Sequence, residues 1–520
     1  MILTGQSPFF EEQSILSGFP LRPHPDAPIP DMAAGLTEIL EEARLSARAL
    51  MDYGSHLLNP TVRLGVTGLS RAGKTVFITA LVHGLLRGGR FPVFDALTTG
   101  RIATARLEPQ PDDAVPRFNY EGHVHTLIEE RRWPESTSDI SELRLAIAFQ
   151  RRSGAERTLT IDIVDYPGEW LLDLPLLDKS YEQWSAESLA LSRQQPRATL
   201  AAAWHAHLAT LDPLGREDEQ ATLTAAKLFT EYLRACRDER FAMSLLPPGR
   251  FLMPGGLKGS PALTFAPLDV AADGTPPDRS LWAMMRRRYD SYKSIVVRPF
   301  FRDHFARLDR QIVLVDALAA FNAGPTALRD LEAALAGILD CFNVGRGSLW
   351  SALFRPRIER ILFAATKADH LHRSSHDRLE AILRRMLDRA AMRAELAGAS
   401  IDVVALAAVR ATREAEVQRG REHLPSILGT PIAGEQAGGE TFDGETEVAT
   451  FPGDLPTDLD SLFSDNSTFR GLTAAQPDES DYRFLRFRPP LLEHGPDETP
   501  ALPHIRLDRA LQFLIGDRLE

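Results

Sequence analysis

Cysteine is scarce in this sequence: the 520 residues include only Cys236 and Cys341. Two cysteines so far apart provide neither a disulfide framework nor the closely spaced Cys and His ligands of a structural zinc site. Scarce cysteine is typical of proteins from a reducing compartment. We therefore expect a cytoplasmic protein without structural disulfides or zinc.

Long hydrophobic runs are also missing. No window of about 18 consecutive apolar residues occurs, so no membrane-spanning helix is predicted. The N-terminus carries Glu11 and Glu12 and lacks the basic start and apolar core of a signal peptide. The sequence therefore predicts neither a membrane-spanning nor a secreted protein.

Positive charge is not in excess. Lys and Arg number 59 against 71 Asp and Glu, a formal net charge of −12, so no nucleic-acid partner is expected. A basic stretch over residues 286–310 is interrupted by Asp290, Asp303 and Asp309. We interpret it as a solvated, ion-paired helix face, and docking to an anionic membrane surface remains the alternative.

The sequence does contain a strong glycine-loop motif. The segment Gly68-Leu-Ser-Arg-Ala-Gly-Lys-Thr75 fits G-x-x-x-x-G-K-[ST], between an apolar run at 64–67 and an amphipathic run at 76–86. In this strand, loop and helix context, backbone N–H groups wrap a phosphate chain and the helix N-terminus adds partial positive charge. The residues assigned to phosphate binding are Gly68, Ser70, Arg71, Ala72, Gly73, Lys74, Thr75 and Val76.

Three side chains of this loop have predicted roles. Lys74 reaches the β- and γ-phosphates, and the Thr75 hydroxyl binds Mg²⁺. Arg71 either neutralises phosphate charge in cis, as an arginine finger does, or points to solvent or pairs with an acid; both interpretations stay open. The loop predicts a nucleoside triphosphate as the ligand.

A second motif, Asp165-Tyr-Pro-Gly168, stands at the end of a hydrophobic strand. The Asp165 carboxylate can hold Mg²⁺ through its water shell, and the Gly168 N–H can meet the γ-phosphate. Asp, Pro and Gly also form turns, so a plain strand-ending turn is the alternative.

A third motif, Thr366-Lys-Ala-Asp369, follows a buried strand. A carboxylate at Asp369 accepts hydrogen bonds from the N1–H and 2-amino groups of guanine, which adenine lacks, and the Lys367 stem packs along the base. A helix N-cap at Asp369 is the alternative. Beyond the last parallel strand, backbone N–H groups at Ala408 and Val409 are predicted to bind the guanine O6. The motifs therefore predict GTP and GDP, with Mg²⁺, as the ligands.

The order of these motifs is that of a translation-factor-like, Ras-like GTPase domain. More narrowly, the chain resembles the YcjX family of bacterial stress-associated P-loop GTPases over about residues 35–520. The resemblance rests on Gly68-Leu-Ser-Arg-Ala-Gly-Lys-Thr75, Trp133-Pro-Glu-Ser-Thr137, Val164-Asp-Tyr-Pro-Gly-Glu-Trp170, Leu314-Val-Asp-Ala-Leu318 and Thr366-Lys-Ala-Asp369. It implies a GTPase domain carrying a helical domain, guanine nucleotide and Mg²⁺ as ligands, and a link to the bacterial envelope-stress response.

Glu169 departs from the general GTPase pattern, and the pattern leaves more than one choice for the switch-I threonine. Glu169 stands where a glutamine usually orients the attacking water, and its carboxylate would repel the γ-phosphate unless it is screened or turned away. Slow intrinsic hydrolysis is therefore expected. The switch-I threonine, which closes on Mg²⁺, is assigned to Thr137, with Thr98 and Thr99 as alternatives.

The pattern of elements predicts an α/β fold of the P-loop, Ras-like type, with a mostly parallel sheet. Strands at 143–150 and 158–164 share a tight turn, so they form an antiparallel edge. Residues 88–120 are predicted to be irregular. The predicted domains are 1–58, an N-terminal arm and helix; 59–171, the first half of the GTPase domain; 172–308, a helical insertion domain; and 309–520, the second half, with a flexible acidic loop at 430–465.

These features predict a Mg²⁺-dependent GTPase that hydrolyses GTP slowly as a switch. Its catalytic groups are assigned to Lys74, Arg71, Thr137, Gly168 and Glu169. The helical insertion is predicted to report the nucleotide state to an unidentified protein partner, with peripheral contact at the inner membrane left open. The rival interpretations are a P-loop ATPase, a non-catalytic scaffold stabilised by nucleotide, and an α/β-hydrolase with Ser70 as nucleophile and His504 as base. The sequence does not predict the oligomeric state.

Overall fold

The computed structural model describes residues 60–69, 71–137, 139–271, 273–342, 358–396, 398–419, 422–437, 439–464, 469–471, 481–492 and 500–520. The predicted N-terminal arm and helix at 1–58 lie outside these residues, as does Ser70 of the glycine loop. Residues Asn59–Glu520 form one compact unit. Among the described helices, none has the length and apolar character needed to cross a membrane.

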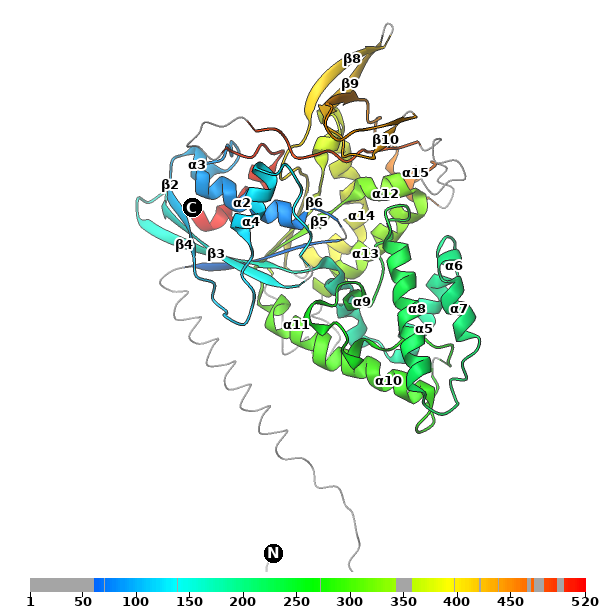
Figure 1. The fold of residues 1–520 in the computed structure, drawn as a ribbon. Helices are drawn as coiled ribbons and strands as arrows, with labels where there is room; N and C mark the ends of the chain where they lie inside the picture. Colours follow the sequence, from blue (N-terminus) through cyan, green and yellow to red (C-terminus); the bar gives the residue numbers. More distant parts are fainter. Residues whose placement is uncertain are drawn as a thin grey trace, which may run out of the picture. The chain divides into compact units, whose positions relative to one another are not determined.

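A sheet of seven strands, in the order β2-β3-β4-β1-β5-β6-β7, organises this unit (Figure 1). The strands are β1 (Thr61–Gly68), β2 (Ile102–Glu108), β3 (Ser141–Gln150), β4 (Glu156–Asp165), β5 (Arg310–Val315), β6 (Arg360–Ala365) and β7 (Ser400–Ala405). Neighbours from β4 to β7 pair in parallel, whereas β3 pairs antiparallel with both β2 and β4. The predicted α/β fold with an antiparallel edge is confirmed.

Strand β5 shows that the sheet is buried on both faces. All six of its residues are buried. Ile312 and Leu314 belong to the core on one face, and Val313 and Val315 to the core on the other, because successive side chains of a strand point to opposite faces. A continuous apolar strand of this kind is typical of a parallel sheet covered by helices on both sides.

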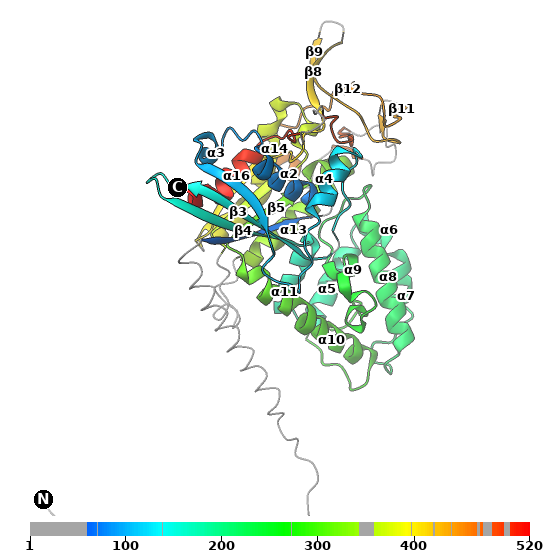
Figure 2. The ribbon, with the colours of Figure 1, turned by 60° about the vertical axis from the view of Figure 1, so that its left-hand side comes forward.

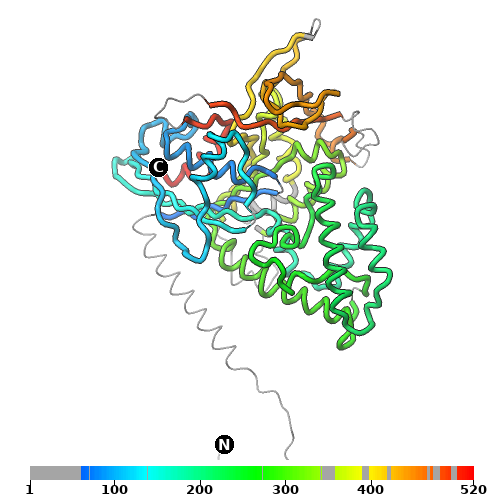
Figure 3. The backbone as a smooth tube through the Cα atoms, viewed as in Figure 1, coloured from blue at the N-terminus to red at the C-terminus, as the bar shows by residue number. Residues whose placement is uncertain are grey.

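Helices cover the two faces. On one face lie α2 (Lys74–Arg87), α4 (Tyr120–Ile128) and α16 (Leu507–Ile515). On the other lie α12 (Ala317–Ala323), α13 (Pro325–Phe342) and α14 (His376–Leu396). Figure 3 shows the end of the chain, in red, returning beside its first strand and helix, in blue. The last helix therefore completes a core that the first strand begins.

Between β4 and β5 the chain forms a helical insertion, which lies on one side of the sheet in Figures 1 and 2. It contains the 3-10 segment η1 (Gly168–Asp178), α5 (Tyr181–Ser192), α6 (Arg197–Leu200), α7 (Ala202–Leu208), α8 (Glu219–Arg237), α9 (Gly249–Leu252), α10 (Leu281–Tyr292) and α11 (Arg298–Asp303). Its core is aromatic: the Trp184 ring stacks on Tyr289 with 5.2 Å between centroids and packs edge-on against Phe229 and Phe265. This core is continuous with one face of the sheet.

The basic stretch at 286–310 is ion-paired at its beginning. Arg286 and Arg287 lie 3.9 Å and 3.7 Å from carboxylate oxygens of Glu182 and Glu217. Arg288 pairs with a carboxylate of α8. These contacts match the predicted ion-paired helix face, and docking to a membrane stays a prediction.

Two segments differ from the prediction. Residues 88–120, predicted to be irregular, contain α3 (Asp95–Thr98) and the edge strand β2. Residues 430–465, predicted as a flexible acidic loop, contain β10 (Gln436–Ala437), β11 (Glu440–Thr441), β12 (Val448–Thr450) and α15 (Leu459–Phe463). A hairpin of β8 (Arg413–Arg419) and β9 (Glu422–Gly429) precedes them, and β12 adds to β9. None of the residues of β2, β10, β11 and β12 is buried, so the hydrophobic pattern of the sequence indicates these strands poorly.

Candidate functional site

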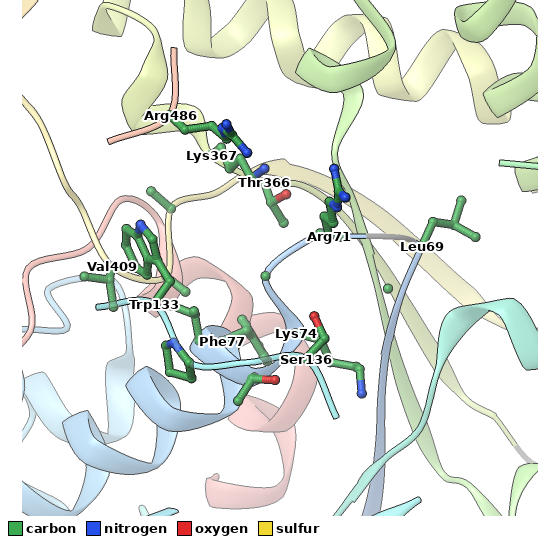
Figure 4. A pocket seen from close by; sticks show the side chains of 18 of the residues that line it. Leu69, Arg71, Lys74, Phe77, Trp133, Ser136, Thr366, Lys367, Val409 and Arg486 are labelled. Carbon is green, nitrogen blue, oxygen red and sulfur yellow. The ribbon is translucent and has the colours of Figure 1, made fainter. Parts of the chain in front are cut away.

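A cavity of about 450 Å³ opens where β1, β4, β6 and β7 end. Its lining side chains include members of the segments 68–77, 133–137, 167–169, 366–370 and 406–409 (Figure 4). Parallel strands end at one edge of their sheet, and ligands of open α/β sheets bind outside these ends. The cavity therefore joins motifs that are distant in the sequence.

The glycine loop has a backbone suited to phosphate. β1 ends at Gly68 and α2 begins at Lys74. Between them Arg71 and Gly73 adopt positive φ angles of 62° and 81°, so the chain turns sharply around the cavity. Gly73 is the N-cap of α2 and has no side chain, so the first N–H groups of the helix remain for a ligand in the cavity.

A hydrogen-bonded cluster joins this loop to the ends of two other segments. Lys74 Nζ donates to Thr137 Oγ1 at 2.9 Å and forms an ion pair with Asp165. Thr137 Oγ1 donates to Asp165 Oδ2 at 2.7 Å. The neighbouring Thr75 is buried, and its Oγ1 donates to the Glu135 carbonyl oxygen at 3.4 Å. The structure thus brings together the residues assigned to Mg²⁺ and to the terminal phosphates.

The oxygen atoms of this cluster fit Mg²⁺. The Asp165 carboxylate and the hydroxyls of Thr75 and Thr137 are hard donors of the type that Mg²⁺ takes together with water and phosphate oxygens. Within the described part of the chain, no three His, Cys, Asp or Glu side chains gather into a potential metal site. A Mg²⁺ ion here would therefore depend on phosphate and water for its other ligands.

The alternatives to Thr137 lie elsewhere. Thr98 and Thr99 belong to the end of α3, and their hydroxyls donate to a backbone carbonyl of the same helix. Of Thr98, Thr99 and Thr137, only Thr137 lines the cavity. His504, the base of the hydrolase alternative, has Nε2 2.7 Å from the carbonyl oxygen of Arg90. This contact lies apart from the cavity-lining residues.

Gly168 lies against the glycine loop. A Cβ atom on Gly168 would stand 2.5 Å from the carbonyl oxygen of Gly68 and 2.9 Å from the N atom of Leu69. Only glycine fits this approach. The next residue, Glu169, is 6% exposed, and its Oε1 lies 3.2 Å from Nη2 of Arg237 at the end of α8. The expected repulsion by Glu169 is therefore opposed by a cation from the helical insertion.

Arg71 takes the ion-paired alternative. Its guanidinium pairs with Glu239, and 53% of its side chain is exposed. Arg486 also pairs with Glu239, at 2.8 Å, and with Glu435, at 2.6 Å. All of these residues except Glu435 line the cavity. A chain of ion pairs thus links the glycine loop, the insertion and the C-terminal part of the protein at the cavity.

The predicted base-binding residues lie together on another wall of the cavity. Asp369 is buried, and its Oδ2 accepts the N–H of Ala411 at 2.8 Å, so it is not a helix N-cap. Lys367 adopts a φ of 60° and pairs with Asp316. Figure 4 shows Thr366 and Lys367 beside each other and Val409 on the wall near Trp133. Thr366, Ala408 and Val409 line the cavity as well.

The cavity residues that were not identified from the sequence include Arg237, Glu239, Met253, Arg486 and Phe487. The first three belong to the insertion and the last two to the C-terminal part. Trp133, in a quoted motif, donates from Nε1 to the Phe487 carbonyl at 2.6 Å. Trp133 belongs to a motif that the sequence shows. The other residues reach the cavity only because distant segments fold together, so no motif marks them.

The insertion also clamps η1 directly after Gly168. Trp170 Nε1 donates to the Met253 carbonyl at 3.0 Å, and the Arg250 guanidinium lies 3.1 Å from the centre of the Trp170 ring. Asp173 accepts the Gly249 N–H at 2.7 Å and the Tyr292 hydroxyl at 2.6 Å. Any shift of Gly168 therefore moves a segment that is tied to the insertion.

The buried carboxyl of Asp173 leads to a prediction. Burial raises its pKa from 3.8 to about 6, against the lowering effect of its hydrogen bonds. Because the folded state holds this proton more tightly, the contribution of Asp173 to stability is greatest below about pH 4 and falls by at most about 3 kcal/mol as pH rises through 4 to 6. Asp173→Asn, which stays neutral, should lack this loss. Urea unfolding of both proteins from pH 4 to 8 measures it, and identical pH profiles would contradict it.

Comparison with known proteins gives the following relatives. The model of the YcjX-like family, DUF463, matches residues 62–519. A protein named "Ras-like GTPase YcjX" from Escherichia coli (strain K12) is 38% identical over 474 residues, which cover 88% of this chain and 96% of the relative. A protein of the same name from Shewanella oneidensis is 34% identical over 491 residues, covering 88% of this chain and 95% of the relative.

Proposed function

Because this chain belongs to the YcjX-like family, we propose that it binds GTP and GDP with Mg²⁺ and hydrolyses GTP to GDP and phosphate. One observation carries the proposal. A single cavity is lined by the glycine loop, by Thr137, which bonds to Asp165, and by Asp369, which is buried on another wall. One cavity thus holds the groups that would bind phosphate, Mg²⁺ and guanine. The names of both relatives agree with it.

Different residues would bind the phosphates, Mg²⁺ and the base. The loop N–H groups and Lys74 would neutralise the β- and γ-phosphates. Thr75, Thr137 and Asp165 would hold Mg²⁺, which supplies further charge neutralisation when bound. The Gly168 N–H would meet the γ-phosphate, and Asp369 would select guanine.

We further propose that hydrolysis is slow and serves a switch. Glu169 replaces the usual water-orienting glutamine and lies paired with Arg237. Gly168 touches the glycine loop and leads into η1, which the insertion clamps through Trp170 and Asp173. A nucleotide-dependent shift of Gly168 would thus reach the insertion, which would present the state to a protein partner. A place in the envelope-stress response, with contact at the inner membrane, is proposed from the family resemblance alone.

Nucleotide titration tests the binding proposal. Fluorescent GDP, GTP and ATP analogues are titrated against wild type and Lys74→Ala, with Mg²⁺ present. Tight binding of both guanine nucleotides, weak binding of ATP and loss of binding in the variant are expected. Equal affinity for ATP would favour the P-loop ATPase.

Single-turnover hydrolysis tests the enzymatic proposal. Protein in excess over GTP is expected to yield GDP and phosphate slowly, and Lys74→Ala is expected to yield none. Absence of turnover in the wild type, with lipid vesicles or cell extract added, would leave the nucleotide-stabilised scaffold.

A further inference from the structure

Among the described residues, the helical insertion brings the guanidinium of Arg237 into ion-pair contact with Glu169, the residue after Gly168. We propose that Arg237 acts as the arginine that this chain itself supplies to the γ-phosphate of GTP during hydrolysis. The proposal rests on the proposed GTPase function and names a catalytic group for it. The sequence motifs point instead to Arg71, inside the glycine loop.

The fold holds the backbone of Arg237 firmly. It is the last residue of α8, which buries Phe229, Tyr232, Leu233 and Cys236 in the aromatic core of the insertion. Such packing fixes the helix end, whereas the arginine side chain beyond it remains 25% exposed. A rigid helix end thus brings the guanidinium to the cavity.

The position of the guanidinium is set by its neighbours. Nη2 of Arg237 lies 3.2 Å from Glu169 Oε1, and Nη1 lies 3.3 Å from Met253 Sδ. Glu169 follows Gly168, whose backbone touches the Gly68 carbonyl at the start of the loop. Arg237 and Lys74 line the same cavity. The guanidinium therefore stands beside the segment that is proposed to meet the γ-phosphate.

The pairing with Glu169 suits a group that changes partners. Among the described residues, no hydrogen bond to Glu169 Oε1 is formed, although the atom is buried. The contact is an ion pair without a directed hydrogen bond. A γ-phosphate offers a guanidinium two parallel, charge-assisted hydrogen bonds, which are stronger. Bound GTP would therefore compete with Glu169 for Arg237.

Arg71 is less suited to this task. Its guanidinium pairs with Glu239, which is also held by Arg486. Half of its side chain faces solvent, at 53% exposure. Arg237 is more enclosed and contacts the residue in the water-orienting position directly.

In the proposed hydrolysis step, water attacks the γ-phosphate of GTP. The water oxygen forms a bond to the γ-phosphorus, and the bond from that phosphorus to the β–γ bridging oxygen breaks, with its electron pair leaving on GDP. One water proton stays on the phosphate and the other is released to solvent. Arg237 neutralises charge on the γ-phosphate oxygens while the bonds change. Its departure from Glu169 leaves that carboxylate to orient the water.

Single-turnover hydrolysis of Arg237→Ala and Arg237→Lys tests the role, with Arg234→Ala as the matched control. Arg234 lies one turn earlier on α8 and is exposed. We expect hydrolysis to fall by about 10³-fold in Arg237→Ala, with little rescue by lysine and no change in Arg234→Ala. GDP and GTP affinity should stay within a few-fold. Trapping of GDP with aluminium fluoride, a mimic of the transferring phosphoryl group, should be lost.

A double variant distinguishes an arginine that acts on the γ-phosphate from one that only neutralises Glu169. If Arg237 only neutralises Glu169, adding Glu169→Gln to Arg237→Ala should restore the rate and the aluminium fluoride complex. The proposal requires both losses to persist. Normal wild-type turnover with an unaffected Arg237→Ala would overturn the role of Arg237 alone. Absence of wild-type turnover would overturn the proposed hydrolysis and this role together.

Discussion

Asp369→Asn is expected to weaken GTP binding by about 10³-fold and to strengthen binding of xanthine nucleotides. Asp369 is buried, and its Oδ2 accepts the Ala411 N–H at 2.8 Å, while the Thr412 hydroxyl donates to its backbone carbonyl. These contacts orient the carboxylate. An asparagine would keep an oxygen toward Ala411 and turn its NH₂ group toward the base.

The size of this effect follows from the donors on the base. Guanine offers N1–H and the 2-amino group at the proposed contact, so an asparagine NH₂ would face a donor. A buried donor without an acceptor costs about 1–3 kcal/mol, and two such mismatches amount to about 10³ in affinity. Xanthine carries a carbonyl at the 2-position, which accepts from NH₂ instead.

Titration with GDP, GTP, XDP and XTP measures the change. Asp377→Asn is the matched control, because Asp377 lies nearby on α14 and its side chain is 87% exposed. The control should bind like the wild type. Unchanged GTP affinity in Asp369→Asn would contradict the base contact. Loss of GTP binding without any gain in xanthine nucleotide binding would indicate a damaged site rather than altered selectivity.

The parts of the site that follow motifs could be predicted from the sequence. Asp165 ends a strand, the glycine loop and Asp369 come after strands, and strands β1, β4 and β6 end at one edge of the sheet. Parallel topology therefore assembles them without further information. Thr137 was assigned by its position before β3, and it bonds to Asp165. The family resemblance, carried by the same motifs, is confirmed by the family match.

The parts that depend on contacts between distant segments could not be predicted. Arg237 ends a helix whose sequence shows many charged residues, Glu239 lies just beyond it, and nothing local marks these two as cavity-facing. Arg486 reaches Glu239 across 247 positions of the chain. The strand β2 lies at an edge of the sheet, and none of its residues is buried. Ion pairs and edge strands of this kind leave only weak periodic signals.

The helical insertion shares its hydrophobic core with the sheet. Its core, with Trp184 and Phe229, continues into the buried face that contains Val313 and Val315. Through Arg237 it contacts the segment after Gly168. We infer that the insertion and the nucleotide cavity are coupled in stability as well as in function.

Gly168→Ala is expected to separate binding from switching. A Cβ there would stand 2.5 Å from the Gly68 carbonyl oxygen, a distance that side chains do not tolerate, so the loop or η1 must shift. Forced overpacking of this kind should cost about 1–3 kcal/mol of unfolding free energy. GTP affinity should fall at least about tenfold more than GDP affinity, because only GTP has the γ-phosphate that Gly168 is proposed to meet.

Gly337→Ala provides the control for adding a methyl group. Gly337 lies within α13, and a Cβ there meets no atom within 4 Å, so this change should raise stability by up to about 1 kcal/mol. Unfolding midpoints and GDP and GTP titrations of both variants measure the contrast. Equal loss of the two nucleotides in Gly168→Ala would assign Gly168 to folding alone. Preferential loss of GTP would support its link to the γ-phosphate, since removal of the proposed N–H contact affects only the nucleotide that carries this group.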